Sequence, residues 1–223
     1  MKKHTFEISG IQKRFGNKTI LSDVYLRCET SEIIGLLGRN GSGKSTLLKI
    51  VAGLESVPDR CVRIDSVSLN IKNALMNNVS YLDQDQFIPN HFSVRKVISL
   101  SIDKENRINF CEDEFIKKLL NKKIRHLSTG ELRYLEIKIV LSNPSLFVLL
   151  DEPYNGLSPL MIESINEMIK GSLNKKGIIV TDHNYQNVVK IANRLVLIKD
   201  GKTHSIKEKT ELVEKGYLTS MAF

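Results

Sequence analysis

The sequence predicts an α/β fold with a mostly parallel sheet, an N-terminal antiparallel β edge and an inserted helical subdomain. Two observations carry this prediction. Short apolar runs alternate with segments of helical periodicity along most of the chain, which is typical of a parallel sheet covered on both faces. The first ~30 residues instead alternate with a period near two, and residues 87–143 show helical patterns without intervening strands.

The elements follow in order along the chain. FEISG and TILSDVYLRCE near the start predict two antiparallel strands. Apolar runs predict later strands over 32–38, 145–153, 177–183 and 195–202. Apolar residues at helical spacing predict core helices over 43–54, 160–173 and 188–194. The inserted helices are predicted over 92–100, 112–123 and 130–142.

Length and composition indicate one large domain. The chain has 223 residues, 41% hydrophobic and 26% charged, which is ordinary for a globular protein. No apolar run approaches the ~18 to 20 residues of a membrane helix, and MKKHTFEISG lacks the apolar stretch of a secretory signal. The three cysteines match no metal-ligand spacing, and their odd number argues against a disulfide framework. The net charge of +8 is consistent with a solvated basic surface, or with nucleic acid, anionic lipid or nucleotide phosphate as partner.

GRNGSGKST at 38–46 fits the phosphate-loop pattern G-x-x-x-x-G-K-[ST] at a strand-to-helix junction. Its glycines permit turns that aim N–H groups at phosphate oxygens, and the helix that follows adds its positive N-terminal end. Lys44 is expected to reach the β- and γ-phosphates, and Ser45 to ligate Mg²⁺. The residues expected to bind the nucleotide here are Gly38, Asn40, Gly41, Ser42, Gly43, Lys44, Ser45 and Thr46.

LFVLLDE at 146–152 places two carboxylates directly after a buried strand. The strand would carry Asp151 to the carboxyl edge of the sheet, where ligands bind in open α/β folds. Asp151 is then expected to face Mg²⁺ through water, and Glu152 to polarise an attacking water. The alternative is that the acidic pair caps the next turn, which Pro153 suits.

LSTGE at 127–131 begins a helical stretch and has two interpretations. Ser128 and Glu131 have the spacing of a capping box, which this segment alone favours. The other interpretation is an anion site made of exposed N–H groups, Ser128 and Gly130.

Five segments occur in the order GRNGSGKST, YLDQ, LSTGE, LLDEP and TDH. Together they resemble the ATP-binding cassette of ABC ATPases, over essentially the whole chain. The resemblance implies a P-loop NTPase core of the ABC ATPase fold, with ATP and Mg²⁺ as ligands. It implies one ABC ATPase domain over 1–223, with the nucleotide-binding core at 1–86 and 144–223 and the helical subdomain at 87–143.

The resemblance also implies roles for single residues. Phe15 takes the place of an aromatic that stacks on adenine, unless it is a buried strand-edge residue. Gln84 matches a glutamine that touches Mg²⁺ or the attacking water, with Gln86 as the alternative. His183 matches a histidine that contacts the γ-phosphate, although a lone histidine is commonly structural. The implied catalytic residues are Lys44, Gln84, Glu152 and His183, and the implied metal ligands are Ser45, Gln84 and Asp151.

In the resembled family, the LSTGE-type segment closes on ATP held by another cassette. The resemblance therefore implies a second ABC ATPase subunit, expected as a homodimer, with Ser128 and Gly130 at the partner's nucleotide. It also implies integral membrane permease subunits and a place on the cytoplasmic face of the cell membrane, and no nucleic acid is expected. A groove for the permease, or else core of the helical subdomain, is expected from Phe87, Ile88, Pro89, Phe92 and Val94.

The implied function is an ATP-binding and ATP-hydrolysing subunit that powers a transporter. ATP would close the dimer and hydrolysis would reopen it. The chain departs from the family pattern at Ser31, Thr129, Glu136, Lys138 and Ser158. The alternatives are a soluble cassette of the iron–sulfur assembly type and a weakly hydrolysing regulatory cassette, the latter suggested by Thr129 and Ser158.

Overall fold

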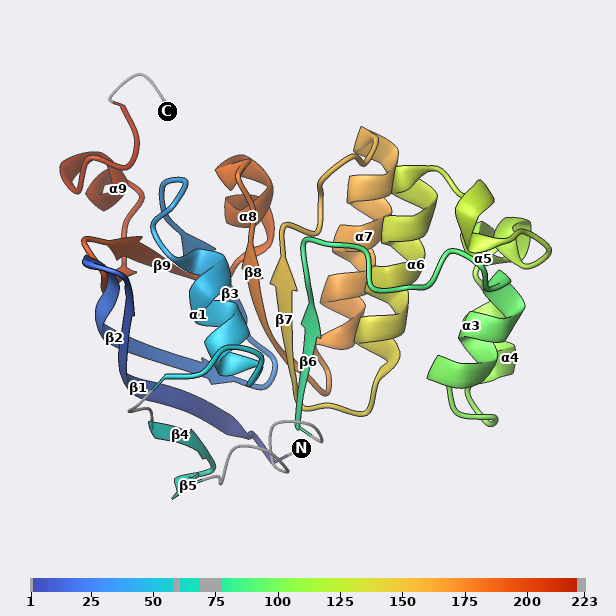
Figure 1. Cartoon of the computed structure of the whole chain (residues 1–223), viewed down its shortest axis with the longest axis horizontal. Coiled ribbons are helices and arrows are strands. Elements are labelled where there is room, and N and C mark those ends of the chain that lie inside the picture. The colour runs from blue at the N-terminus through green and yellow to red at the C-terminus, as the bar shows by residue number, and fades with distance from the viewer. Residues whose placement is uncertain (1, 58–60, 69–77, 220–223) are drawn as a thin grey trace.

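The computed structural model describes residues 2–57, 61–68 and 78–219 (Figure 1). Within these ranges one ten-stranded sheet has the order β5-β4-β1-β2-β10-β9-β3-β8-β7-β6. The strands are β1 (Thr5–Phe15), β2 (Lys18–Glu29), β3 (Ile33–Leu37), β4 (Cys61–Ile64), β5 (Val67–Ser68), β6 (Val79–Leu82), β7 (Phe147–Asp151), β8 (Gly177–Thr181), β9 (Arg194–Lys199) and β10 (Lys202–Ile206). The helices are α1 (Lys44–Val51), α3 (Val94–Ser101), α4 (Arg107–Glu112), α5 (Glu114–Leu119), α6 (Thr129–Ser142), α7 (Pro159–Ser172), α8 (Tyr185–Ile191), α9 (Thr210–Glu214) and the 3₁₀ helix η1 (Ile124–His126).

The sheet has a parallel half and an antiparallel half, as the sequence predicts. β6, β7, β8, β3 and β9 pair in parallel, and β3, β7 and β8 are buried at every position. β1 pairs antiparallel with β2 and β4. The two halves meet where β10 pairs in parallel with β2 and antiparallel with β9. The predicted α/β fold with an antiparallel edge is confirmed.

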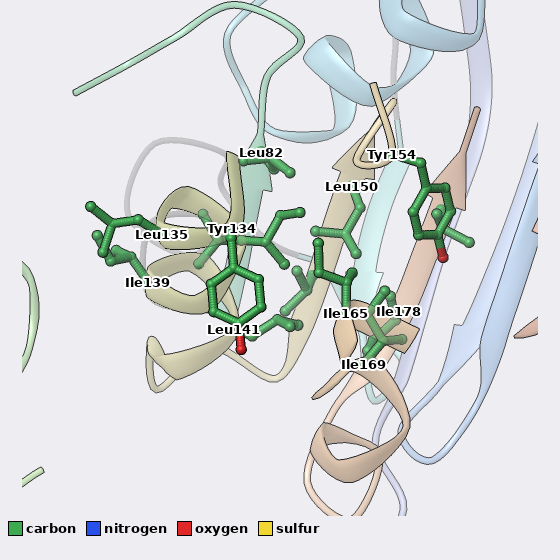
Figure 2. Packing of buried hydrophobic residues seen from close by; sticks show 14 of the residues in the cluster. Leu82, Tyr134, Leu135, Ile139, Leu141, Leu150, Tyr154, Ile165, Ile169 and Ile178 are labelled. Carbon is green, nitrogen blue, oxygen red and sulfur yellow. The ribbon is translucent and has the colours of Figure 1, made fainter. Parts of the chain in front are cut away.

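Alternate residues of the central strands point into two hydrophobic clusters. Ile34 and Leu36 pack with Leu47 and Leu48 of α1 on one side. On the other side, β7 and β8 pack against α6 and α7 (Figure 2). A parallel strand covered on both faces reads as a continuous apolar run, which explains why these runs marked the strands.

Residues 87–143 hold α3, α4, α5, η1 and α6, which lie at the opposite end of the molecule from the antiparallel strands (Figure 1). The prediction of one helix over 112–123 is wrong, because Asp113 separates α4 from α5. Asp113 has non-helical dihedral angles, and its carboxylate accepts hydrogen bonds from the backbone N–H groups of Phe115 and Ile116, each at 2.9 Å. The same carboxylate pairs with Lys138 of α6 at 2.7 Å. Among the residues described, no helix is both long and apolar enough to cross a membrane.

Candidate functional site

The loop between β3 and α1 is shaped by its glycines. Gly41 and Gly43 have φ values of 75° and 100°, a region that disfavours other residues. A Cβ on Gly43 would also lie 2.8 Å from the Ile20 side chain of β2. Gly43 is the N-cap of α1 and supplies no side-chain acceptor. The N-terminal end of α1 is therefore suited to an anionic ligand held by backbone N–H groups.

Lys44 lies inside this loop, with 7% of its surface exposed. Its ammonium donates hydrogen bonds to the carbonyls of Gly38 at 2.9 Å and Arg39 at 3.4 Å. Burial lowers the pKa of Lys44, while the nearby carboxylates of Glu152 and Asp151 act to raise it. The two carbonyls thus hold a buried cation at the point where the sequence expects phosphate.

Ser45, Gln84 and Asp151, the expected metal ligands, lie together. Asp151 is fully buried at the end of β7, and its Oδ1 accepts from the Ser45 hydroxyl at 3.1 Å and the Gln84 amide at 3.3 Å. The Gln84 amide also donates to the Ser45 Oγ at 2.8 Å, and Tyr81 donates to Asp151 Oδ2 at 3.1 Å. Burial raises the pKa of Asp151, and these hydrogen bonds oppose that shift. Gln86 instead donates to Ile88 and Asn90.

This donor set fits Mg²⁺, which prefers oxygen ligands and binds through one or two carboxylates. The Ser45 hydroxyl and the Asp151 carboxylate are in place, and Asp151 is fully buried. Gln84 presents its amide nitrogen here, so its oxygen would face the same point only after a half-turn of the amide. No cluster of three or more His, Cys, Asp or Glu side chains suited to a metal occurs among the described residues.

Glu152 and His183 lie side by side at the ends of β7 and β8. Glu152 has a positive φ of 49°, and its N–H donates to the Thr181 carbonyl at 2.9 Å. His183 Nδ1 lies 3.9 Å from Glu152 Oε2 and 3.4 Å from Asp182 Oδ1. The His183 side chain is 56% exposed, so it is available to a ligand rather than packed in the core.

Phe15 ends β1 opposite Lys18 of β2 and is 53% exposed. The alternative of a buried strand-edge aromatic is therefore wrong. The Lys13 ammonium lies over the Phe15 ring, 5.0 Å from its centroid, in a cation–π contact. The start of β2 and the phosphate loop share the lining of a cavity of about 510 Å³, and Phe15 lies beside that wall at the hairpin end.

Among the described residues, no hydrogen bond joins Ser128 or Gly130 to the phosphate loop of the same chain, although Thr129 between them lines one hollow together with Gln84 and Arg133. The Ser128 hydroxyl accepts from the Glu131 N–H at 3.2 Å, and the Glu131 carboxylate accepts from the Ser128 N–H at 2.8 Å. This confirms the capping box. A Cβ on Gly130 would lie 3.3 Å from the Gly156 carbonyl. Ser128 is nevertheless exposed.

Arg133 is a residue that the sequence analysis missed. It projects from α6, is 6% exposed, and donates to the carbonyls of Asp83 at 2.7 Å, Asp151 at 2.7 Å and Glu152 at 3.0 Å. It also pairs with Glu136 at 3.4 Å. Arg133 therefore links α6 by hydrogen bonds to Asp83, next to Gln84, and to the backbone of Asp151 and Glu152 at the end of β7. The Arg–Glu spacing of three on a helix was the available signal.

The structure shows the conformation or the contacts of the residues that depart from the family pattern. Ser31 has a φ of 68°, the region that glycine adopts easily. Thr129 packs its methyl group toward Gly156. Ser158 caps α7 by accepting from the Met161 N–H at 3.4 Å. Glu136 is 2% exposed and accepts from the Phe87 N–H at 3.2 Å, and burial raises its pKa.

Comparison with known proteins gives consistent findings. The family model described as "ABC transporter" matches residues 21–155. The lipopolysaccharide export system ATP-binding protein LptB of Escherichia coli K12 is 30% identical over 226 residues, covering 94% of this chain and 93% of that protein. LptB of Haemophilus influenzae is 29% identical over 206 residues, covering 86% of each chain. YtrB of Bacillus subtilis, an ABC transporter ATP-binding protein, is 26% identical over 227 residues and covers 97% of this chain and 76% of that protein.

Solved structures show the same fold. The ATP-binding subunit of an ABC transporter superposes with a TM-score of 0.83 at 18% identity, covering 95% of this chain and 93% of that one. A nucleotide-free ATP-binding cassette gives a TM-score of 0.82 at 16% identity, covering 97% and 96%. The fold expected from the resemblance is thus confirmed.

Proposed function

The chain belongs to the ABC transporter family as an ATP-binding, ATP-hydrolysing subunit that powers a transporter, and we propose that it works as a head-to-tail homodimer closing on two MgATP molecules. The observation that supports the MgATP site in this proposal is that Ser45, Gln84 and Asp151 meet beside the N-terminal end of α1. The comparisons reported above give no support to an iron–sulfur assembly ATPase.

ATP binding begins at the phosphate loop. The N–H groups of the loop and of the α1 terminus surround the phosphates, and Lys44 exchanges its carbonyl partners for the β- and γ-phosphate oxygens. Phe15 stacks on the adenine at the exposed end of β1. Ser45 and Asp151 would hold Mg²⁺, with the Gln84 amide turned to present its oxygen. When bound there, the ion would supply positive charge against the phosphates.

Hydrolysis needs a base next to the γ-phosphate. Glu152 follows Asp151 directly, and its carboxylate lies 3.9 Å from the His183 ring nitrogen. Glu152 can therefore orient the attacking water while His183 contacts the γ-phosphate. Arg133 holds the Glu152 carbonyl and thereby fixes the backbone that carries the base. Preorganised groups of this kind need no rearrangement when charge develops.

The exposed start of α6 supplies the second half of the site. We assign the exposed Ser128 and the buried Gly130 to the nucleotide held by the partner, because neither residue has a hydrogen bond to the phosphate loop of its own chain in the part that the structure describes. ATP then favours the closed dimer through contacts that exist only in that state. After hydrolysis these contacts weaken and the dimer reopens.

The proposed partners are integral membrane permease subunits, with this chain peripheral on the cytoplasmic face. In the expected groove, Ile88 and Val94 are buried in the core, whereas Phe87 is 47% exposed. Pro89 is also exposed and Phe92 is half-buried against the core. Phe87 is therefore the exposed aromatic residue of this set, and with Pro89 it offers an apolar surface to a permease. The relatives named LptB belong to a lipopolysaccharide export system, and that name supports an exporter.

Light scattering on the purified chain tests the dimer. The Glu152→Gln variant with ATP and Mg²⁺ should double in mass from 25.3 kDa, because the nucleotide stays bound without being hydrolysed. Adding Lys44→Ala to that variant should keep it monomeric. Binding of ATP with an unchanged mass would contradict the closed dimer.

A photo-crosslinking amino acid tests the membrane partner. Placed at Phe87 in cells, it should capture a polytopic membrane protein. The same amino acid at Tyr25, which is exposed to a similar degree on β2, serves as the control. Equal capture from both positions, or capture of soluble proteins alone from Phe87, would contradict the permease assignment.

A further inference from the structure

Two segments of the helical subdomain carry most of the positive charge of the chain. Residues 90–96 and 117–126 hold seven lysines and arginines and no aspartate or glutamate. The net charge of the whole chain is +8, so these two short segments account for nearly all of it. None of the roles described above uses this charge.

The two segments lie side by side at the end of the molecule that faces away from the antiparallel strands (Figure 1). Ser93 pairs with Lys123 in an isolated antiparallel bridge, which two backbone hydrogen bonds of 2.9 and 3.0 Å form. Arg95 reaches across the pair, where its Nε donates to the Asn121 side chain at 3.3 Å. The fold therefore gathers the charges of both segments in one place.

Most of these cations have no acidic partner. Lys117 pairs with Glu114 at 2.7 Å, and Lys122 pairs with Glu131 at 2.8 Å. The other five side chains are exposed and form no salt bridge with any described residue. Like charges this close repel one another, and an anionic ligand would relieve that repulsion. We call these five residues the basic surface, and they are Arg95, Lys96, Lys118, Lys123 and Arg125.

The basic surface is continuous with the apolar residues that are proposed to face the permease. The N–H of Arg125 donates to the Asn90 carbonyl at 3.2 Å, and Asn90 directly follows the exposed Pro89. Phe87, two residues earlier, is 47% exposed. A permease bound at Phe87 would therefore bring the basic surface close to the membrane in which the permease lies.

Exposed apolar side chains flank the basic surface on its other side. Lys96 and Leu100 are one turn apart on α3 and so share a face of the helix, and Leu100 is 61% exposed. Ile108 of α4 is 75% exposed, and its neighbour Arg107 donates to the Ser99 carbonyl of α3 at 2.6 Å. Cations beside exposed apolar side chains are typical of surfaces that lie against a membrane interface.

We propose that the basic surface binds the headgroups of anionic phospholipids in the leaflet that this chain faces. The inference rests on the proposed place of the chain on the membrane. The cations come from α3, α5 and η1 with its N-cap, so they spread over several elements, and this arrangement fits a layer of headgroups better than one fixed acidic residue. Each lysine or arginine near an anionic bilayer strengthens binding about fivefold, and the attraction acts over about 10 Å.

Flotation of the purified full chain with lipid vesicles tests the proposal. Vesicles of an equal mixture of phosphatidylglycerol and phosphatidylcholine should carry the chain, and vesicles of phosphatidylcholine alone should not. Added salt should release the chain, because it screens exposed charges. A triple variant, Lys118→Gln with Lys123→Gln and Arg125→Gln, should bind the anionic vesicles about 100-fold more weakly.

A second triple variant serves as the matched control. Lys170→Gln, Lys202→Gln and Lys207→Gln together remove the same charge from exposed positions outside the helical subdomain, so this variant should lose less than about threefold. Unfolding midpoints should equal that of the wild type in both variants. If the first variant is destabilised, Lys118→Gln with Lys123→Gln replaces it, with an expected loss of about 25-fold.

The outcomes separate this inference from its alternatives. Absence of binding to the anionic vesicles, or an equal loss in the two triple variants, would overturn the proposal. If the chain binds no vesicles and only the first triple variant leaves the membranes of its native cell, the basic surface belongs to an acidic segment of a protein and the lipid assignment is wrong. Vesicle binding by a chain that captures no membrane protein from Phe87 would overturn the permease assignment alone.

Discussion

The phosphate-loop edge and the start of α6 are built in contrasting ways. At the loop edge, the fully buried Asp151 takes hydrogen bonds from β6, α1 and the segment after β6. At the start of α6, Ser128 is exposed and bonds within its own capping box. The first region is assembled before any ligand arrives. The second is complete as a helix start, and its proposed ligand must come from another molecule.

The two regions also differ in what they do to stability. Burial raises the pKa of Asp151 and lowers that of Lys44, and Glu152 has a positive φ. Each of these features disfavours the folded state without ligand. The capping box stabilises α6 instead. Substitutions at the loop edge should therefore raise stability while they lower activity. At the start of α6, a substitution can change stability or activity without changing the other.

The largest effect is expected for Glu152→Gln. An amide cannot take the proton of the attacking water, so kcat should fall about 10²- to 10⁴-fold. The affinity for MgATP should stay within about threefold, because Glu152 is not proposed to bind the nucleotide. Phosphate release and equilibrium binding measure the two quantities. Wild-type turnover in this variant would exclude Glu152 as the base.

The next largest effect is expected for Arg133→Met, which would leave Glu136 buried without its cation. Loss of one partner of a buried pair costs about 3 to 5 kcal/mol of unfolding free energy, which urea unfolding measures. Lys117→Met removes an exposed partner of Glu114 and should cost less than about 0.5 kcal/mol.

The double variant Arg133→Met with Glu136→Met sharpens this comparison. It should recover most of the stability, since no unpaired charge remains in the interior. Turnover should stay low, because the carbonyls of Asp151 and Glu152 lose their shared donor. Recovery of both quantities would mean that Arg133 contributes to packing alone.

The contrast between the regions also explains what the sequence could predict. The loop at 38–46 and the strand ending at Asp151 were found because glycine spacing and continuous apolar runs are local signals. Arg133 was not found, because its partners are backbone atoms from distant segments. A carbonyl or N–H exists at almost every position, so such a bond leaves no pattern in the sequence. The helix break at Asp113 was missed for a related reason, since Lys138 and Tyr134 come from another helix.

Ser128 shows a different limit. Its capping box could be predicted from the spacing to Glu131, and the structure contains it. A cap and an anion site use the same residue types at a helix start, so the pattern supports both. The pattern alone therefore does not decide whether Ser128 also binds an anion.

A smaller effect, with opposite signs on stability and activity, is expected for Asp151→Asn. The folded-state pKa of Asp151 lies above its ordinary value of 3.8, so the unfolded state releases this proton first as pH rises. The wild type therefore loses stability from this group between pH 3.8 and the raised pKa. Asp151→Asn should gain about 1 to 2 kcal/mol of unfolding free energy at pH 7, and the gain should vanish below about pH 4.

The same variant should lose Mg²⁺-dependent turnover, because an amide lacks the negative charge that we propose as a ligand of the ion. Thermal unfolding across pH and phosphate release with and without EDTA measure the two effects. Tyr81→Phe keeps the carboxylate and removes one donor to it, so it should retain turnover. A destabilised Asp151→Asn variant would contradict the view that the buried charge costs stability.

The smallest effect on stability is expected at Ser128, and it separates capping from ligand binding. Ser128→Ala should lose about 1 kcal/mol and lower the midpoint by about 2 to 4 °C, because the Glu131 N–H loses its acceptor. Ser128→Asn should keep the cap, since asparagine caps as well as serine. Its larger side chain would still obstruct the partner's nucleotide, so turnover should fall severalfold at unchanged stability. If Ser128→Asn keeps both stability and turnover, the start of α6 does no more than begin a helix, and the second half of the site must lie elsewhere on the partner.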